Sequence, residues 1–343
     1  MRKLFFTLLI IVGFLLSVEV LLRYVFGFCD ALLYQHSDSY EYIAQPNQER
    51  YRFGAHSRYN AYSQRNDSNP DSTKVRVLGL GDSVIFGGTM IDQDSIATTL
   101  FSKETGMQML NISAGSWGPD NCAAYLKEKG TFGASAMVLV CSSHDARDIM
   151  SHIAVVGKYP NYPVRQYKMA VWELMDRYLL PCIKGYFIQD IPRLDPDKVI
   201  VEHIENASVA PKSMMFNPGF YKLKTIADSV AIPFYIYLHA EQGEVYRGEY
   251  NEMGKQIISW AQEAGVSCYT GLAMGETVDM YRDVIHLNEK GQRHLSECLK
   301  KIIVINHINE LRYSNQKFRT IGMSFLLYYA NGVNALIFIY ITL

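Results

Sequence analysis

The sequence lacks the charge pattern of a nucleic-acid-binding protein. Its 33 Lys and Arg residues almost balance 34 Asp and Glu residues, for a formal net charge of −1, and no basic block stands out. Nucleic acids attract clustered positive charge, so we expect no nucleic-acid partner. Internal repeats and low-complexity tracts are also missing. With 49% hydrophobic and 20% charged residues, the chain has the composition of a globular protein that also contains apolar segments of the kind found in membrane proteins.

The six cysteines lack the spacing of a metal or redox site. No Cys-x-x-Cys pair occurs, so neither a zinc site nor a thioredoxin-like motif is indicated, and we predict no metal and no cofactor. Their even number permits disulfides in an oxidising compartment, whereas the apolar runs around Cys141 and Cys268 favour buried thiols. The cysteines therefore leave the compartment open.

Residues 1–28 contain a long hydrophobic run but no clear cleavage site. The run extends from Leu4 to Leu22, and at about 1.5 Å per residue it nearly matches a bilayer core of about 30 Å. Arg2 and Lys3 favour a cytoplasmic N-terminus. Because no Ala-x-Ala pattern follows, we favour an uncleaved signal-anchor over a removed signal peptide. Glu19 is unusual in a span, but near the helix end it can reach the interface. We predict a membrane protein whose following domain is extracytoplasmic.

A second apolar run covers residues 321–343 at the end of the chain. It is long enough to span a membrane, but Asn331, Gly332 and Asn334 at its centre are costly in lipid. Basic residues just before the run, on the expected outer side, also weigh against a span. A second transmembrane helix and a hydrophobic tail packed elsewhere both remain open, so the protein is single-pass or two-pass.

Between these runs, the sequence alternates strand-like and helix-like segments. Residues 29–73 are polar and lack sustained periodicity. We expect them to connect the membrane segment to the next domain and to pack partly on that domain. Residues 74–310 form that domain, in which alternation predicts a mainly parallel sheet with helices on both faces, a three-layer α/β/α sandwich. A segment at about 146–215 interrupts the alternation, and either shapes a substrate cleft or is a structural cap. The predicted strands are 75–80, 108–112, 136–141, 232–238 and 266–269.

The first predicted strand ends in Gly81-Asp82-Ser83. Open α/β sheets bind their ligands at the carboxyl ends of the strands, where Ser83 is placed. The glycines around it let the backbone turn sharply and approach a substrate. Most copies of this common tripeptide are ordinary turns, so its meaning depends on the rest of the chain.

A base and an acid for this serine are found near the end of the domain. A serine hydroxyl is a weak nucleophile and needs a neighbouring base that an acid orients. Asp283 and His286 are three residues apart, which places them on the same side of a helix or turn. His286 would take the proton of Ser83 while Asp283 orients the imidazole. The alternative is a capping aspartate beside an incidental surface histidine.

Donors for a developing oxyanion are available at the ends of the next strands. The backbone N–H of Ser83 supplies one, and Gly115 supplies another, with Gly118 as a weaker candidate. His144 follows the third strand and offers a side-chain donor. Each has an ordinary explanation as a turn glycine or a capping histidine, but together they assemble a nucleophile, a base, an acid and donors at successive strand ends.

With these motifs, the chain resembles the SGNH (GDSL-type) hydrolase superfamily over about residues 74–305. The resemblance rests on three motifs, an intact Gly81-Asp82-Ser83, Asn111-Ile-Ser-Ala-Gly115 and Asp283-Val-Ile-His286. The resemblance implies a flavodoxin-like five-stranded sheet, Ser83 as nucleophile, and His286 as the base that Asp283 orients. It also implies an oxyanion hole with the N–H groups of Ser83 and Gly115. Where the family has Gly-x-Asn-Asp, this chain has Ser142-Ser-His-Asp145, so His144 stands in place of the usual asparagine donor.

The resemblance also implies an activity. We expect a membrane-anchored serine esterase or O-acyltransferase that forms an acyl-enzyme and acts on small acyl esters or on acylated extracytoplasmic carbohydrate. Two other functions remain open. One is a catalytically weak or inactive carbohydrate-binding or assembly protein with the same fold, and the other is a lipid-directed esterase.

Overall fold

The computed structural model describes residues 2–187, 215–319, 326–330 and 333–337. The chain divides into two compact units, Met1–Ser296 and Glu297–Leu343. The first unit contains the central sheet and all the residues considered for a functional site. The second contains most of helix α12 (Glu289–Arg319) and the C-terminal strands.

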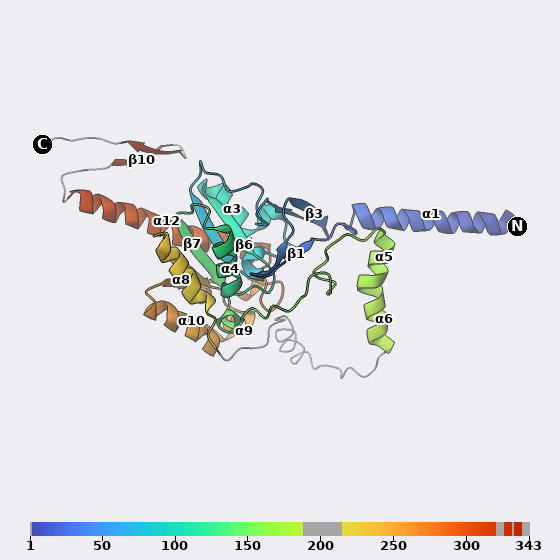
Figure 1. The fold of residues 1–343 in the computed structure, drawn as a ribbon. Helices are drawn as coiled ribbons and strands as arrows, with labels where there is room; N and C mark the ends of the chain where they lie inside the picture. Colours follow the sequence, from blue (N-terminus) through green and yellow to red (C-terminus); the bar gives the residue numbers. More distant parts are fainter. Residues whose placement is uncertain (1, 188–214, 320–325, 331–332, 338–343) are drawn as a thin grey trace. The chain divides into compact units, whose positions relative to one another are not determined.

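The first unit is built around one parallel sheet (Figure 1). Four of its strands are almost wholly buried, because they are apolar runs covered on both faces. The sheet order is β6-β5-β7-β8-β9, which is the doubly wound 2-1-3-4-5 order with its switch point between β5 and β7. This confirms the predicted α/β fold. The strands are β5 (Arg76–Gly81), β6 (Gln108–Ser113), β7 (Ala136–Cys141), β8 (Phe234–Leu238) and β9 (Ser267–Thr270).

Helices cover both faces of the sheet, as right-handed crossovers require. The step from β5 to β6 runs in the opposite direction along the sheet to the later steps, so α3 covers one face and α4, α8 and α10 cover the other. On the second face, Trp260 of α10 packs on Phe220 of α8 with ring centroids 5.3 Å apart. The helices are α3 (Ala97–Thr105), α4 (Pro119–Lys129), α8 (Gly219–Ser229) and α10 (Glu252–Glu263).

Short helical segments connect these elements. The 3-10 turn η1 (Gln93–Ser95) precedes α3, because the side chain of Asp92 caps the turn through the N–H of Asp94. The others are α2 (Ser83–Phe86), η2 (Ser143–Ala146), α9 (Gln242–Arg247), α11 (Gly271–Met274) and η4 (Val278–Met280). The sequence did not indicate α2, α9 or α11, since each is too short to show a helical period.

The N-terminal part begins with helix α1 (Arg2–Tyr24), which is long and apolar enough to cross a membrane. Among the described residues it is the one such helix. The segment 29–73 is more ordered than its pattern indicated, because it forms two antiparallel hairpins with many buried residues. Their strands are β1 (Tyr34–Ser37), β2 (Glu41–Ala44), β3 (Gln48–Arg52) and β4 (Ala55–Tyr59).

The interrupting segment at 146–215 is described as far as residue 187; residues 188–214 lie outside the described part, so the interpretation of the segment as a lid or cap stays a prediction. It contains a continuous helical stretch of α5 (Ala170–Leu174), a π-helical turn η3 (Met175–Leu179) and α6 (Leu180–Phe187).

For residues 321–343 we had left open a second transmembrane helix. Their described residues form instead an antiparallel pair, β10 (Leu326–Ala330) with β11 (Val333–Ile337). The Asn-Gly dipeptide between these strands in the sequence favours a tight hairpin turn over a continuous helix, which accounts for the difference. The rest of the run lies outside the described residues. Helix α12, expected to end near residue 305, extends to Arg319.

Candidate active site

Ser83 lies where strand β5 turns into the short helix α2. The turn depends on Gly81, whose φ is +154° and where a Cβ atom would come within 2.2 Å of the Val140 carbonyl oxygen on β7. Asp82 caps α2, because its Oδ1 accepts a hydrogen bond of 2.8 Å from the Val84 N–H. This local geometry places the Ser83 side chain at the carboxyl end of the central strand.

His286 and Asp283, which are distant from Ser83 in the sequence, lie directly beside it. The Nε2 atom of His286 is 3.0 Å from Ser83 Oγ, and its Nδ1 is 2.9 Å from Oδ2 and 3.0 Å from Oδ1 of Asp283. All three distances are within hydrogen-bond reach. The structure therefore brings the predicted nucleophile, base and acid together in the order that proton transfer requires.

Asp283 is held as an ionised acceptor. Partial burial acts to raise the pKa of its carboxyl group, but hydrogen bonds from the His286 ring and from the backbone N–H groups of His286 and Ile285 outweigh it and lower the pKa. The two backbone bonds measure 2.7 Å and 3.0 Å and fix the carboxylate against its own loop. The acid therefore has a defined position and charge at neutral pH.

A buried histidine contacts the loop that carries Asp283 and His286. The His239 ring, wholly inaccessible to solvent, lies 2.8 Å from the Ile285 carbonyl oxygen through Nε2 and 2.8 Å from Glu276 Oε1 through Nδ1. Burial opposes its charged form, but the Glu276 carboxylate and the Ile285 carbonyl raise its pKa above the usual value. The Gln242 N–H also donates to the Val284 carbonyl. These contacts from the end of β8 position His286.

The two glycines considered as oxyanion donors differ. The Gly115 carbonyl accepts a hydrogen bond of 2.7 Å from the Tyr42 hydroxyl, and a Cβ atom at Gly115 would meet nothing within 4 Å. The space beside this residue is therefore open. The Gly118 N–H, by contrast, donates to Asn121 Oδ1 at 2.9 Å at the start of α4, so it serves as a helix cap and is not aimed at the site.

His144 lies in the 3-10 turn that follows β7, among carboxylates. Its Nε2 is 3.8 Å from Asp82 Oδ2, and its Nδ1 is 3.3 Å from Glu241 Oε1. Asp145, which follows it, accepts a 2.7 Å hydrogen bond from the Ser142 N–H. Because Asp82 directly precedes Ser83, the structure places the His144 imidazole next to the nucleophile's strand end.

The carboxylates around His144 determine its charge. Burial acts to lower its pKa, but Asp145, Glu241 and Asp82 together raise it well above the usual value. At Glu241, burial acts to raise the pKa of the carboxyl group, but the hydrogen bond and the charge of His144 have the larger effect, so this pKa is lowered. Burial raises the pKa of Asp145 well above its usual range, and Asp82 adds to this effect.

Asp82, His144 and Asp145 also have the spacing of a cation site, with one ligand atom from each within 4.8 Å of the others. Carboxylates and imidazole are suitable ligands for several divalent metals. Both nitrogens of the His144 ring already face carboxylate oxygens, with Nδ1 3.3 Å from Glu241 Oε1 and Nε2 3.8 Å from Asp82 Oδ2. We therefore interpret the group as an ion cluster in which His144 is the cation.

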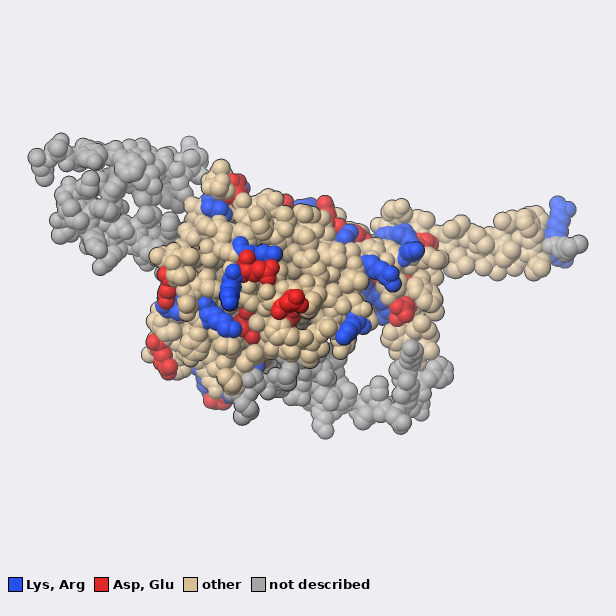
Figure 2. Space-filling view, viewed as in Figure 1, with Lys and Arg blue, Asp and Glu red and all other residues tan. Residues whose placement is uncertain are grey.

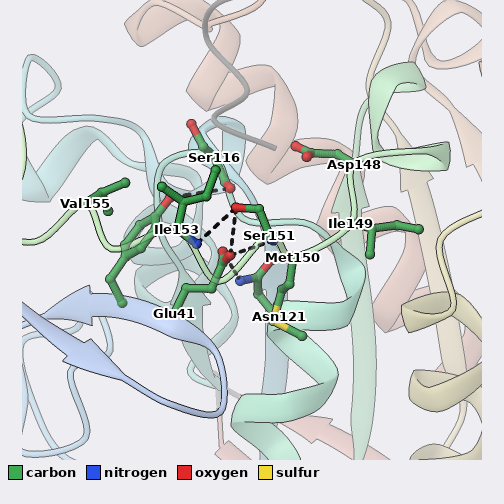
Figure 3. Close-up of a pocket in the computed structure, with 10 residues that line it drawn as sticks. Glu41, Ser116, Asn121, Asp148, Ile149, Met150, Ser151, Ile153 and Val155 are labelled. Atoms are coloured by element: carbon green, nitrogen blue, oxygen red, sulfur yellow. Dashed lines mark hydrogen bonds between the residues drawn. The ribbon is translucent and has the colours of Figure 1, made fainter. Parts of the chain in front are cut away.

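A small pocket is lined by residues of the loops that follow β6 and β7 and by the β2 hairpin (Figure 3). Its wall includes Ser116, the residue after Gly115, and Asp148, whose pKa burial raises to about 6. Glu41 lies at its base and accepts backbone hydrogen bonds from Ser151 and His152, at 2.8 Å and 2.6 Å. Hydroxyl, carboxyl and apolar groups thus share one concave surface. The full lining is Glu41, Tyr42, Ser116, Asn121, Asp148, Ile149, Met150, Ser151, Ile153 and Val155.

Three residues with a role in this arrangement were not found from the sequence: Asp82 as a partner of His144, Glu241 and His239. Glu241 and His239 follow β8, so the rule that strand ends carry functional side chains could have indicated them. Asp82 is part of a recognised motif, but its contact with His144 depends on β5 and β7 being neighbours in the sheet.

The chain matches no protein-family model, and no curated protein is similar to it in sequence. Solved structures that resemble it include lipolytic and esterase proteins. A member of the lipolytic protein G-D-S-L family from Veillonella parvula is 11% identical, covering 67% of this chain and 98% of its own, with a TM-score of 0.33. A psychrotrophic esterase from Pseudoalteromonas sp. is 11% identical, with coverages of 68% and 98% and a TM-score of 0.38. The lipase/acylhydrolase from Enterococcus faecalis is 12% identical, with coverages of 67% and 95% and a TM-score of 0.37. These identities and scores are low, so we base the function on the geometry of the site.

Proposed function

We propose that this protein is a serine hydrolase that acts on acyl esters through an acyl-enzyme. The observation that carries the proposal is the 3.0 Å contact between His286 Nε2 and Ser83 Oγ, with Asp283 on the other nitrogen of the same ring. A serine hydroxyl, an imidazole and a carboxylate in this order form the general arrangement for nucleophilic attack on an ester carbonyl.

In the first step, His286 takes the proton of Ser83 as Oγ bonds to the ester carbonyl carbon. The imidazolium then gives this proton to the alcohol oxygen as the ester C–O bond breaks, which leaves the acyl group on Ser83. In the second step, His286 takes a proton from water, whose oxygen bonds to the acyl carbon. The imidazolium then returns this proton to Ser83 Oγ as the bond between Oγ and the acyl carbon breaks, which releases the acid and restores the serine. Asp283 stabilises the imidazolium in both steps and stays ionised itself.

The oxyanion that forms in each step needs hydrogen-bond donors. We assign this role to the backbone N–H groups of Ser83 and Gly115 and to the side chain of His144. A protonated His144 is a charge-assisted donor, which is stronger than the neutral amide of an asparagine. The carboxylates that raise its pKa keep it in this form.

The substrate class we propose is a small acyl ester of a hydroxyl-rich molecule, such as an acylated carbohydrate. The support is the open space beside Gly115, where a Cβ atom would meet nothing within 4 Å, so a small acyl group has room next to this donor. Transfer of the acyl group to a sugar hydroxyl in place of water uses the same acyl-enzyme. We further propose that α1 spans the membrane as a signal-anchor and that the site is extracytoplasmic, since Arg2 and Lys3 precede the helix.

The test is hydrolysis of p-nitrophenyl esters by the full chain in detergent. We expect turnover of the acetyl ester, a sharp decrease with long acyl chains, and a loss of about 10⁴-fold or more in Ser83→Ala. Circular dichroism checks that the variant is folded. Adding a sugar acceptor distinguishes transfer from hydrolysis through the acetylated product. A folded wild-type chain with no activity above Ser83→Ala would contradict the proposal and favour the binding-protein alternative. A preference for long acyl chains would favour the lipid-directed esterase.

A further inference from the structure

Glu19, the acidic residue inside the apolar helix α1, has a specific partner. Its two carboxylate oxygens accept hydrogen bonds from the backbone N–H groups of Ala170 and Val171, at 2.8 Å and 2.9 Å. These N–H groups belong to the first turn of α5, where a helix leaves its donors unsatisfied. Arg23 pairs with the same carboxylate at 2.7 Å and also donates to the Lys168 carbonyl. Glu19 therefore caps α5 from within α1.

A second carboxylate completes the attachment of α5 to the end of α1. Glu173 is wholly inaccessible to solvent and accepts from the Cys29 N–H at 2.6 Å. It also pairs with Arg52 at 2.7 Å and with Arg177 at 3.0 Å. Around these polar contacts, Leu22, Phe28 and Ala170 form a small buried apolar cluster. The first turn of α5 is thus tied to the last turns of α1 by both ionic and apolar contacts.

The other side of the α5–α6 stretch exposes large apolar side chains. Trp172 is 57% exposed, Leu179 41% and Ile183 46%, and Met169 just before the helix is 58% exposed. They follow one another along the continuous helical stretch, and the one exposed charged residue between Trp172 and Leu179 is Asp176, which accepts a hydrogen bond from the Tyr167 hydroxyl. We name these four residues the outer apolar face. Such a face is costly in water but suits the boundary between lipid headgroups and acyl chains.

The position of Glu19 along α1 indicates what covers this face. Glu19 is five residues before the last residue of α1, about 7 Å along the axis at 1.5 Å per residue. Helices that lie in a membrane interface bury their apolar face by about 5–10 Å, so the N-terminus of α5 is at the depth where such a helix begins. Figure 2 shows no Lys, Arg, Asp or Glu along the visible side of α1 between its N-terminal end and the region where it joins the rest of the unit.

We propose that residues 169–183 form a membrane-interface helix, held by Glu19, whose outer apolar face lies in the lipid of the outer leaflet. The proposal rests on the membrane span proposed for α1 but is independent of the hydrolase activity. Trp172 is the anchor, because an indole has an apolar ring and a polar N–H and is enriched at this depth. Glu19 is tolerated in α1 because α5 supplies two donors for its carboxylate.

Trp172 also provides the probe. The chain has three tryptophans, and the other two, Trp117 and Trp260, are 0% and 6% exposed. The full chain is reconstituted in phosphatidylcholine vesicles with and without brominated acyl chains, which quench nearby indoles. The difference between wild type and Trp172→Phe isolates the emission of Trp172. We expect bromine near the headgroups to reduce this difference at least about twofold, and bromine near the bilayer centre to reduce it less.

A matched control moves the probe to another exposed site. Tyr246 of α9 is 70% exposed and outside the outer apolar face, so Tyr246→Trp in the Trp172→Phe background should show no bromine quenching. Glu19→Ala should weaken the quenching of Trp172, since α5 loses the acceptor for its first two donors. Quenching that is unaffected by Glu19→Ala would overturn the role assigned to Glu19.

Alkaline carbonate extraction of the same vesicles separates the two hypotheses. If the chain stays in the membrane and Trp172 is not quenched, or is quenched no more than the Tyr246→Trp probe, the interface helix is wrong and the span of α1 stands. If carbonate extracts the wild-type chain, both the span and the interface helix are wrong. Esterase activity measured in parallel is expected to be retained in Trp172→Phe, because Trp172 is not part of the catalytic site.

Discussion

Two histidines lie near Ser83, in very different surroundings. His286 has one carboxylate partner, Asp283, which is 44% exposed, and its other nitrogen is 3.0 Å from the Ser83 hydroxyl. His144 has carboxylates around it that are far less exposed, Asp82 at 2% and Glu241 at 16%, and they raise its pKa. The first environment links the ring to the nucleophile on one side and to an acid on the other, as a general base requires. The second favours the charged form of the ring, and this suits a fixed donor better than a base.

The largest effect is expected at the base. His286→Ala should reduce kcat by about 10⁶-fold, because among the described residues His286 is the one whose side chain lies at hydrogen-bond distance from both Ser83 Oγ and a carboxylate, and triad residues act as a unit. Asp283→Asn should cost about 10⁴-fold, since the amide no longer selects the productive tautomer of His286. Steady-state kinetics with p-nitrophenyl acetate measures both. Retention of a tenth or more of the wild-type rate in a folded His286→Ala variant would mean that another residue is the base.

A smaller effect is expected at His144. Loss of one oxyanion donor costs about 10²–10³-fold in kcat in a comparable serine enzyme, so we expect His144→Ala to fall in this range with little change in KM. His144→Asn, which restores a neutral donor, should recover part of the loss. Equal rates in His144→Ala and wild type would remove His144 from the oxyanion hole.

The pH profile distinguishes a charged donor from a neutral one. Since the pKa of His144 is raised, its proton is fully present at low pH and is lost as pH rises through the folded pKa. Activity should therefore fall on the alkaline side in the wild type and lack this fall in His144→Asn. The contribution of the charged ring to stability follows the same direction, full below the unfolded pKa of about 6.5 and lost as pH rises further. An identical alkaline limb in the two proteins would contradict a protonated donor.

The smallest effect is expected at Glu241. Glu241→Gln removes one of the charges that raise the pKa of His144, so the alkaline limb should move to lower pH while the rate near neutral pH changes little. The measurement is kcat against pH, with Glu249→Gln as the matched control, because Glu249 is 66% exposed and pairs only at 3.9 Å with Lys255. A limb that moves equally in both variants would show that net charge, and not the contact with His144, controls it.

The comparison of the two histidines also shows how far the sequence could predict the site. Ser83, Asp283 and His286 were found because each belongs to a short motif whose spacing carries chemical meaning. The strands were found because buried parallel strands are continuous apolar runs. The partners of His144 were not, because Glu241 is 97 residues away in the chain and meets it only since β7 and β8 are neighbours. The hairpins in residues 29–73 were not found because strands of four or five residues with many polar side chains show little hydrophobic alternation.

The role of Glu19 was missed for a similar reason. As a single acidic residue near the end of an apolar run, it suggested a side chain that reaches the interface. Its actual partners, the first N–H groups of α5, are about 150 residues later in the chain. Backbone donors leave no trace in the residue type, so no sequence pattern marks them.

The nucleophile itself is tested most directly by active-site labelling. The full chain is treated with a fluorophosphonate, digested, and examined by mass spectrometry, with folded Ser83→Ala as the control. We predict one phosphonylated residue, Ser83, no labelling of Ser83→Ala, and strongly slowed labelling of His286→Ala, because the base must remove the proton of Oγ. An unlabelled wild-type chain, or a label at the same yield in Ser83→Ala, would contradict the central claim that Ser83 is an activated nucleophile.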